Sequence, residues 1–208
     1  MALDAGRWEK LCHALGVAVD REEFARLNAA YAEPQRAYHT AQHINECLDR
    51  LDWALGQQDF PDAPAVATAL WYHDAVYQPT QHDNEALSAD QAVAFLQGGG
   101  CDAALQQQVH ALIMATSHGD IPTEPAQQLL VDIDLSILGA SPERFAEFEK
   151  QIRFEYSWVP LENYRARRAE LLQHFLARPR LYSTDVFHDL LEAQARKNVQ
   201  AAINTLTA

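Results

Sequence analysis

Apolar residues recur at every third or fourth position along most of this 208-residue chain, which is the spacing that one buried face of an α-helix requires. The segment 40–57 is the clearest case, with Ile44, Leu48, Leu51 and Leu55 on one face. Proline and glycine residues separate such segments and set the bounds of the predicted helices. We expect helices at about 20–32, 40–57, 65–76, 84–96, 103–117 and 125–138, followed by further amphipathic helices after Ser141 that are interrupted near Pro160 and Pro179.

Local signals at the predicted helix starts agree with this pattern. Asp20 precedes Glu23 by three residues, as in a capping box, and Thr40 stands where the next helix needs a cap. Ser141 is followed by a proline, which favours another helix start. The segment 131–134 alternates apolar and acidic residues, but it is short and lies among helix formers. We therefore expect an all-α fold in one compact domain.

Charge is distributed unevenly along the chain. The formal net charge is −13, which argues against binding to nucleic acid or to an anionic membrane, because both need a basic face. No lysine or arginine occurs between Arg50 and Arg144, and this acidic stretch carries several histidines. Ten of the sixteen basic residues follow position 140. The middle of the chain suits a divalent cation and the last third suits a phosphate, although solvated helix surface is the plainer interpretation of any single arginine.

Cysteine usage and the opening residues favour the cytoplasm. Cys12, Cys47 and Cys101 are odd in number and scattered, so they fit reduced thiols better than a disulfide framework or a zinc finger. Residues 1–10 lack the basic leader and apolar stretch of a secretory signal. No window reaches the roughly 18 apolar residues of a membrane-spanning helix. We expect a cytoplasmic protein.

The candidate chemistry lies in a few histidines and aspartates. His39 and His43 are four residues apart, so on a helix they share one face. His73 and Asp74 form an adjacent imidazole–carboxylate pair in an apolar helix, where a buried carboxylate needs compensation. A metal ion is one compensation, with Asp134 as a further ligand, and a buried hydrogen-bonded network is the alternative. Imidazole and carboxylate ligands together suit Mn, Fe, Co, Ni or Zn, and Mg stays open.

The order of these residues resembles a known signature. His43, then His73 with Asp74, then Asp134 is similar to the H…HD…D motif of the HD superfamily of metal-dependent phosphohydrolases. Residues 38–43 resemble the YHxxxH motif of cyclic nucleotide phosphodiesterases, which share this helical core. A closer resemblance, covering most of the chain, is to small bacterial predicted HD-type phosphohydrolases. Their recurrent strings match residues 38–40, 71–77, 83–85 with Ser88, and 132–139.

The resemblance implies a role for each matching residue. His43, His73, Asp74 and Asp134 match the metal ligands, and His39 matches the proton donor to the leaving group. The metal count and the base specificity do not carry over, because a double-histidine motif and a long purine-clamp region are missing from the sequence. Glu85 is a candidate for orienting water or a ligating histidine, or else is an ordinary first-turn carboxylate. His118 is a candidate for binding a phosphate oxygen or a second metal, and Arg36 and Arg153 are candidates for binding phosphate. Asp132 is expected as a helix cap or an acceptor behind the ligands, with metal ligation as the alternative.

These observations predict one HD-type helical domain over 1–208, with a metal-site core at about 36–140 and the helices of 142–206 packed on it. We expect a metal-dependent phosphohydrolase that acts on a small phosphate ester, above all a nucleotide, through a metal-activated water. Nucleic acid and membranes are not expected partners, and a homodimer stays open.

Two alternatives to the phosphohydrolase remain. One is a non-catalytic nucleotide-binding or regulatory HD module, and the other is a diiron HD-type oxygenase, whose extra ligands only His110 and His118 could supply.

Overall fold

The computed structural model describes residues 1–117 and 121–208, and within these ranges it contains helices and turns but no strand. This confirms the expected all-α fold. The chain divides into two compact units, Met1–Val131 and Asp132–Ala208. The division falls inside helix α7 (Pro125–Asp134), before residue 140, where the sequence predicts the end of the metal-site core. Within the described ranges, no helix is both long enough and apolar enough to cross a bilayer.

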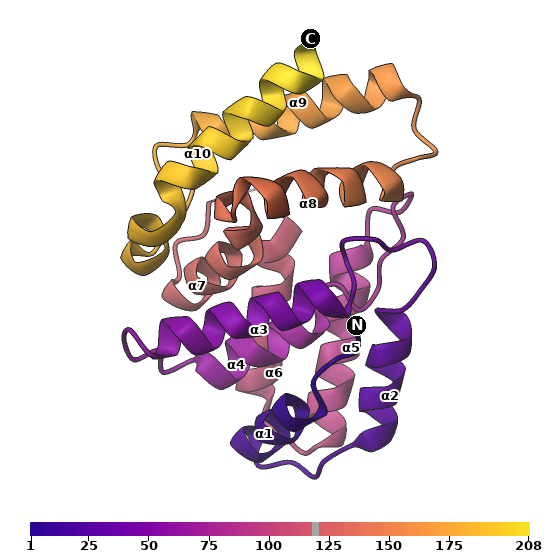
Figure 1. Ribbon diagram of the computed structural model, residues 1–208. Helices are drawn as coiled ribbons and strands as arrows, with labels where there is room; N and C mark the ends of the chain where they lie inside the picture. Colours follow the sequence, from indigo (N-terminus) through magenta and orange to yellow (C-terminus); the bar gives the residue numbers. More distant parts are fainter. Residues whose placement is uncertain (118–120) are drawn as a thin grey trace. The chain divides into compact units, whose positions relative to one another are not determined.

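Helix α4 (Ala63–Tyr72) is the centre of the first unit (Figure 1). The helices around it are α1 (Ala5–Leu15), α2 (Arg21–Ala30), α3 (Ala41–Leu55), α5 (Asn84–Gly98) and α6 (Ala103–Met114), which continues as a 3₁₀ turn at Ala115–Ser117. Seven of the ten residues of α4 are buried, because it packs against α1, α3, α5 and α6. A helix with neighbours on most sides must be apolar nearly all round, and α4 is.

The second unit contains the end of α7, a short 3₁₀ helix and three longer helices. These are η2 (Leu135–Gly139), α8 (Pro142–Glu155), α9 (Leu161–Ala177) and α10 (Asp185–Thr207). Helices α9 and α10 lie side by side (Figure 1), and η2 packs against both α8 and α10. Gly139 makes this approach possible, because a Cβ atom there would lie 2.6 Å from the Cβ atom of Leu191.

Three predicted helix starts are confirmed. The side chains of Asp20, Thr40 and Ser141 each accept a hydrogen bond from an amide two or three residues further on, and they are the N-caps of α2, α3 and α8. The carboxylate of Glu23 has another partner, because it accepts a hydrogen bond of 2.6 Å from the Tyr72 hydroxyl of α4. Glu23 therefore ties α2 to the end of α4.

Candidate metal centre

Helix α3 places His43 in the interior of the first unit. Thr40 is its N-cap, so His43 lies in the first helical turn, where it is 2% exposed. His39 precedes the cap and lies in a turn outside the helix, although the centroids of the two imidazole rings are only 6.0 Å apart. The prediction that the two histidines share a helix face is wrong, because a cap at Thr40 excludes His39 from α3.

Helix α4 ends at Tyr72, earlier than the predicted end near Val76. His73 is the C-cap, and Asp74 lies in the turn that follows. The amide of Ala75 donates to the carbonyl of Tyr72 at 2.8 Å, which tightens this turn. The His-Asp pair therefore lies at the end of the apolar helix rather than within it.

Arg36 holds this turn against the segment that precedes α3. Its guanidinium donates to the main-chain carbonyl oxygens of Asp74 at 2.7 Å and Ala75 at 3.1 Å. It also donates to the carbonyl of His39 at 3.1 Å and to the Glu33 carboxylate at 3.0 Å, and its side chain is 0% exposed. These contacts engage the guanidinium within the protein, so they support a positioning role and not the expected phosphate contact.

The His73 ring is oriented by its own helix. Its Nδ1 atom lies 3.0 Å from the carbonyl oxygen of Leu70. A carbonyl oxygen only accepts hydrogen bonds, so Nδ1 carries the proton and Nε2 presents a lone pair. Metal-ligating histidines are commonly held in this way, with the second ring nitrogen donating to a carbonyl.

Three side-chain atoms converge at this point. His73 Nε2 lies 3.1 Å from His43 Nε2 and 3.1 Å from Asp74 Oδ2, and His43 Nε2 lies 3.4 Å from Asp74 Oδ2. Metal–ligand bonds of about 2.0–2.2 Å place neighbouring ligand atoms about 3.0–3.5 Å apart in octahedral or tetrahedral geometry. The spacing of the three atoms therefore fits a single cation between them.

The electrostatics of Asp74 agree with a bound cation. Within the described residues, its buried Oδ2 atom lies at ion-pair distance from the two imidazoles but makes no well-formed hydrogen bond. Burial by itself raises the pKa of this carboxyl, but the charge that His73 and His39 carry when protonated outweighs burial and holds the pKa well below its ordinary value. When the rings are neutral, as metal ligation requires, an ionised Asp74 needs another positive charge, and a divalent ion would supply one.

Two further side chains contact the predicted histidines. Tyr77 stacks on His39, with 4.1 Å between ring centroids and 27° between planes. Cys47 lies one turn along α3 from His43, with its Sγ atom 3.6 Å from Nδ1. Sequence reasoning places Tyr77 mainly in the core and gives Cys47 no role at the site. The four-residue spacing of His43 and Cys47 is the signal that identifies the second contact.

Helix α5 secures the segment that follows Asp74. The amide of Val76 donates to Ser88 Oγ at 3.0 Å, and the amide of Gln78 donates to Asn84 Oδ1 at 3.0 Å. The part of α5 that contains Asn84 and Ser88 therefore holds the segment after Asp74 in place beside the site. Glu85 lies in the first turn of α5 and is not among the described residues whose ligand atoms converge. Its catalytic role stays a prediction.

Asp134 and Arg153 belong to the second unit. Asp134 is the last residue of α7, and its role as a fourth ligand stays a prediction. Arg153 donates to the carbonyl oxygens of Tyr156 at 2.6 Å and Val159 at 3.2 Å, so it closes the C-terminal end of α8. These contacts favour a structural role for Arg153 over the expected phosphate contact. His118, the remaining phosphate candidate, lies outside the described residues.

Asp132 holds the turn that leads into helix α10. Its carboxylate accepts hydrogen bonds from the amides of Ser183 at 2.8 Å and Thr184 at 2.7 Å, and from the Thr184 hydroxyl at 2.6 Å. Burial raises the pKa of Asp132 to about 6, although these hydrogen bonds lower it in part. The N-cap residue of α10 is Thr184, so Asp132 secures the residues that precede α10 and is not itself the cap.

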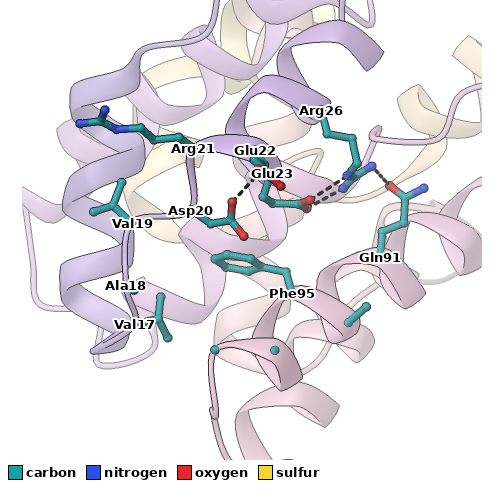
Figure 2. A pocket seen from close by; sticks show the side chains of 13 residues that line it. Val17, Ala18, Val19, Asp20, Arg21, Glu22, Glu23, Arg26, Gln91 and Phe95 are labelled. Carbon is teal, nitrogen blue, oxygen red and sulfur yellow. Dashed lines mark hydrogen bonds and ion pairs between the residues drawn. The ribbon is translucent and has the colours of Figure 1, made fainter.

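A separate cavity of about 890 Å³ lies in the first unit, between the start of α2 and helix α5 (Figure 2). Arg26 crosses it, bonded to Glu23 at 2.6 Å and to Gln91 at 2.7 Å. The converging histidines and Asp74 do not line this cavity in the part of the chain that is described. It is therefore distinct from the candidate metal centre.

Comparison of the chain with models of protein families, with curated proteins and with solved structures found no match. Function must therefore be inferred from the local motifs and from the geometry of the converging side chains.

Proposed function

We propose that this chain is a metal-dependent phosphohydrolase of the HD type, whose divalent ion is held by His43, His73 and Asp74. The observation that carries the proposal is the convergence of two imidazole nitrogens and one buried carboxylate oxygen within 3.1–3.4 Å of one another. Asp134 is proposed as a further ligand on the resemblance of the H…HD…D order alone.

The arrangement of the residues around the site supports a hydrolytic reaction. A divalent ion in such a set supplies Lewis acidity and lowers the pKa of a coordinated water. His73 keeps its Nε2 lone pair available because Nδ1 is engaged by the Leu70 carbonyl. His39 is held by stacking on Tyr77, and we assign it the transfer of a proton to the leaving oxygen of the substrate.

The proposed substrate is a small phosphate ester, and a nucleotide is the first candidate. Arg36 is engaged with main-chain carbonyls, so the charge of a bound phosphate is balanced by the ion and by a basic group other than Arg36. Glu85 remains the candidate for orienting the attacking water.

A hydrolysis screen tests the proposal. Purified protein is incubated with a panel of nucleotides and sugar phosphates in the presence of Mn²⁺, Co²⁺, Ni²⁺ or Mg²⁺, beside the Asp74→Asn variant. We expect metal-dependent release of phosphate or a nucleoside from at least one substrate, and its loss in the variant. Saturable nucleotide binding without turnover would favour a regulatory module instead, and two bound irons with oxygen-dependent product would favour an oxygenase.

A further inference from the structure

A second cavity lies wholly within the second unit, between α8, the first turn of α9 and the last turns of α10. Its volume is about 520 Å³, and small-molecule sites commonly span about 300–1,000 Å³. Alanines line it on two sides, Ala146 from α8 and Ala201 and Ala202 from α10, and such short side chains leave the space between these helices open. The apolar walls are completed by Pro142, Phe145, Leu161 and Leu206.

The charged side chains at this cavity carry an excess of positive charge. Lys150 and Arg165 line it, both are exposed, and neither makes a hydrogen bond or ion pair with another described residue. The one lining carboxylate, Glu149, is neutralised by Arg168 at 2.5 Å. Arg153 also lines the cavity but donates to main-chain carbonyls. Two cations therefore remain for a ligand.

Tyr164 completes the apolar wall. Its side chain is only 8% exposed, and its hydroxyl is closed off from solvent, so other atoms of the side chain line the cavity. The Arg153 guanidinium lies 4.7 Å from the ring centroid and fixes the ring from one side.

We propose that this cavity binds a small amphipathic carboxylate. Its apolar body lies against Phe145 and the alanines of α10, and its carboxylate meets Lys150 and Arg165. The site is formed by the second unit alone. Failure of this proposal would therefore leave the proposed metal centre unaffected, and failure of the metal centre would leave this proposal unaffected.

Ligand-observed NMR titration of the full chain with octanoate tests the proposal, with 1-octanol and octylammonium as matched ligands. We expect octanoate to bind at one site at least about tenfold more tightly than either matched ligand, which is the discrimination that about 1.4 kcal/mol provides. Equal affinity for octanoate and 1-octanol, or no binding of octanoate, would overturn the proposal.

Three variants locate the site. Ala202→Trp fills the cavity and should abolish octanoate binding. The double variant Lys150→Glu, Arg165→Glu reverses the charge at two exposed positions and should weaken binding at least tenfold without loss of folding. It therefore tests the site even where the tryptophan variant fails to fold. Tyr164→Phe is the matched control, because it removes a hydroxyl that is closed off from solvent, and it should bind octanoate as tightly as wild type does. Unchanged affinity in the charge-reversal variant would exclude this cavity as the site.

Discussion

The main-chain carbonyl of Asp74 accepts a hydrogen bond of 2.7 Å from Arg36, which lies 38 positions earlier in the chain. The same guanidinium donates to the carbonyl of His39. One buried cation therefore joins the turn that carries the His-Asp pair to the turn that carries the candidate proton donor.

Arg36→Met should lower the free energy of unfolding by about 3 kcal/mol or more, because it removes the hydrogen bonds that the carbonyls of His39, Asp74 and Ala75 accept from the guanidinium, at about 1–3 kcal/mol for each group left unsatisfied in the interior. Urea unfolding measures the loss. Arg180→Met is the matched control, since the Arg180 side chain is 42% exposed and pairs with an exposed aspartate, and it should change stability by no more than about 1 kcal/mol. Equal effects of the two variants would contradict the positioning role.

His39→Ala should keep the metal and lose turnover by roughly 10²–10⁴-fold, the usual contribution of a general acid. The loss should be smaller for a nitrophenyl phosphate than for an alkyl phosphate, because nitrophenolate needs little protonation to leave. His43→Ala, only four residues further along the chain, should lose metal and activity together for both substrates. A His39 variant that loses its metal, or that hydrolyses alkyl phosphates at the wild-type rate, would remove the proton-donor assignment.

The lowered pKa of Glu23 predicts that the stability of the fold depends on pH. Burial raises the pKa of this carboxyl, but hydrogen bonds from Arg26 and Tyr72 outweigh burial and lower it below the ordinary 4.5. A lowered folded-state pKa stabilises the fold above pH 4.5, and this contribution disappears as the pH falls through the folded-state value. The difference in unfolding free energy between wild type and Glu23→Gln should therefore be constant near neutral pH and shrink below about pH 4.5. A difference that grows on acidification would show the opposite sign of shift.

Gly139→Ala should destabilise the second unit by about 1–3 kcal/mol, the usual cost of overpacking. The added methyl group would lie 2.6 Å from the Cβ atom of Leu191 and 3.0 Å from its carbonyl oxygen, neither of which moves without the backbone. Gly98→Ala is the control, because nothing lies within 4 Å of a Cβ atom at that position. Thermal unfolding of both variants tests this, and a Gly139 variant as stable as the Gly98 variant would exclude close packing of η2 on α10.

The helices were predictable from the sequence because their signals are local. The apolar spacing of α3 and the caps at Asp20, Thr40 and Ser141 depend only on residues within a few positions of each other. The end of α4 was not predictable in this way. Tyr72, Ala75 and Val76 continue the apolar helical spacing, and the turn after Tyr72 depends on Arg36 and Ser88, which are distant in sequence.

The candidate site shows the same division between local and distant contacts. His43, His73 and Asp74 are brought together as the H…HD order predicts. The sequence alone did not distinguish a buried basic residue that binds main-chain carbonyls, such as Arg36, from an exposed one, such as Lys150. Only the packing around each side chain separates them.

Calorimetric titration of the metal-free protein with Mn²⁺ or Zn²⁺ tests the proposed metal centre most directly, in wild type, Asp74→Ala and the control Asp59→Ala, which removes an exposed carboxylate of the same unit. We expect wild type and the Asp59 variant to bind one or more ions with equal affinity. The Asp74 variant should lose more than the roughly 10–100-fold that removal of an outer partner costs. Equal metal affinity in all three proteins would contradict the ligand assignment and the metal-dependent hydrolysis built on it.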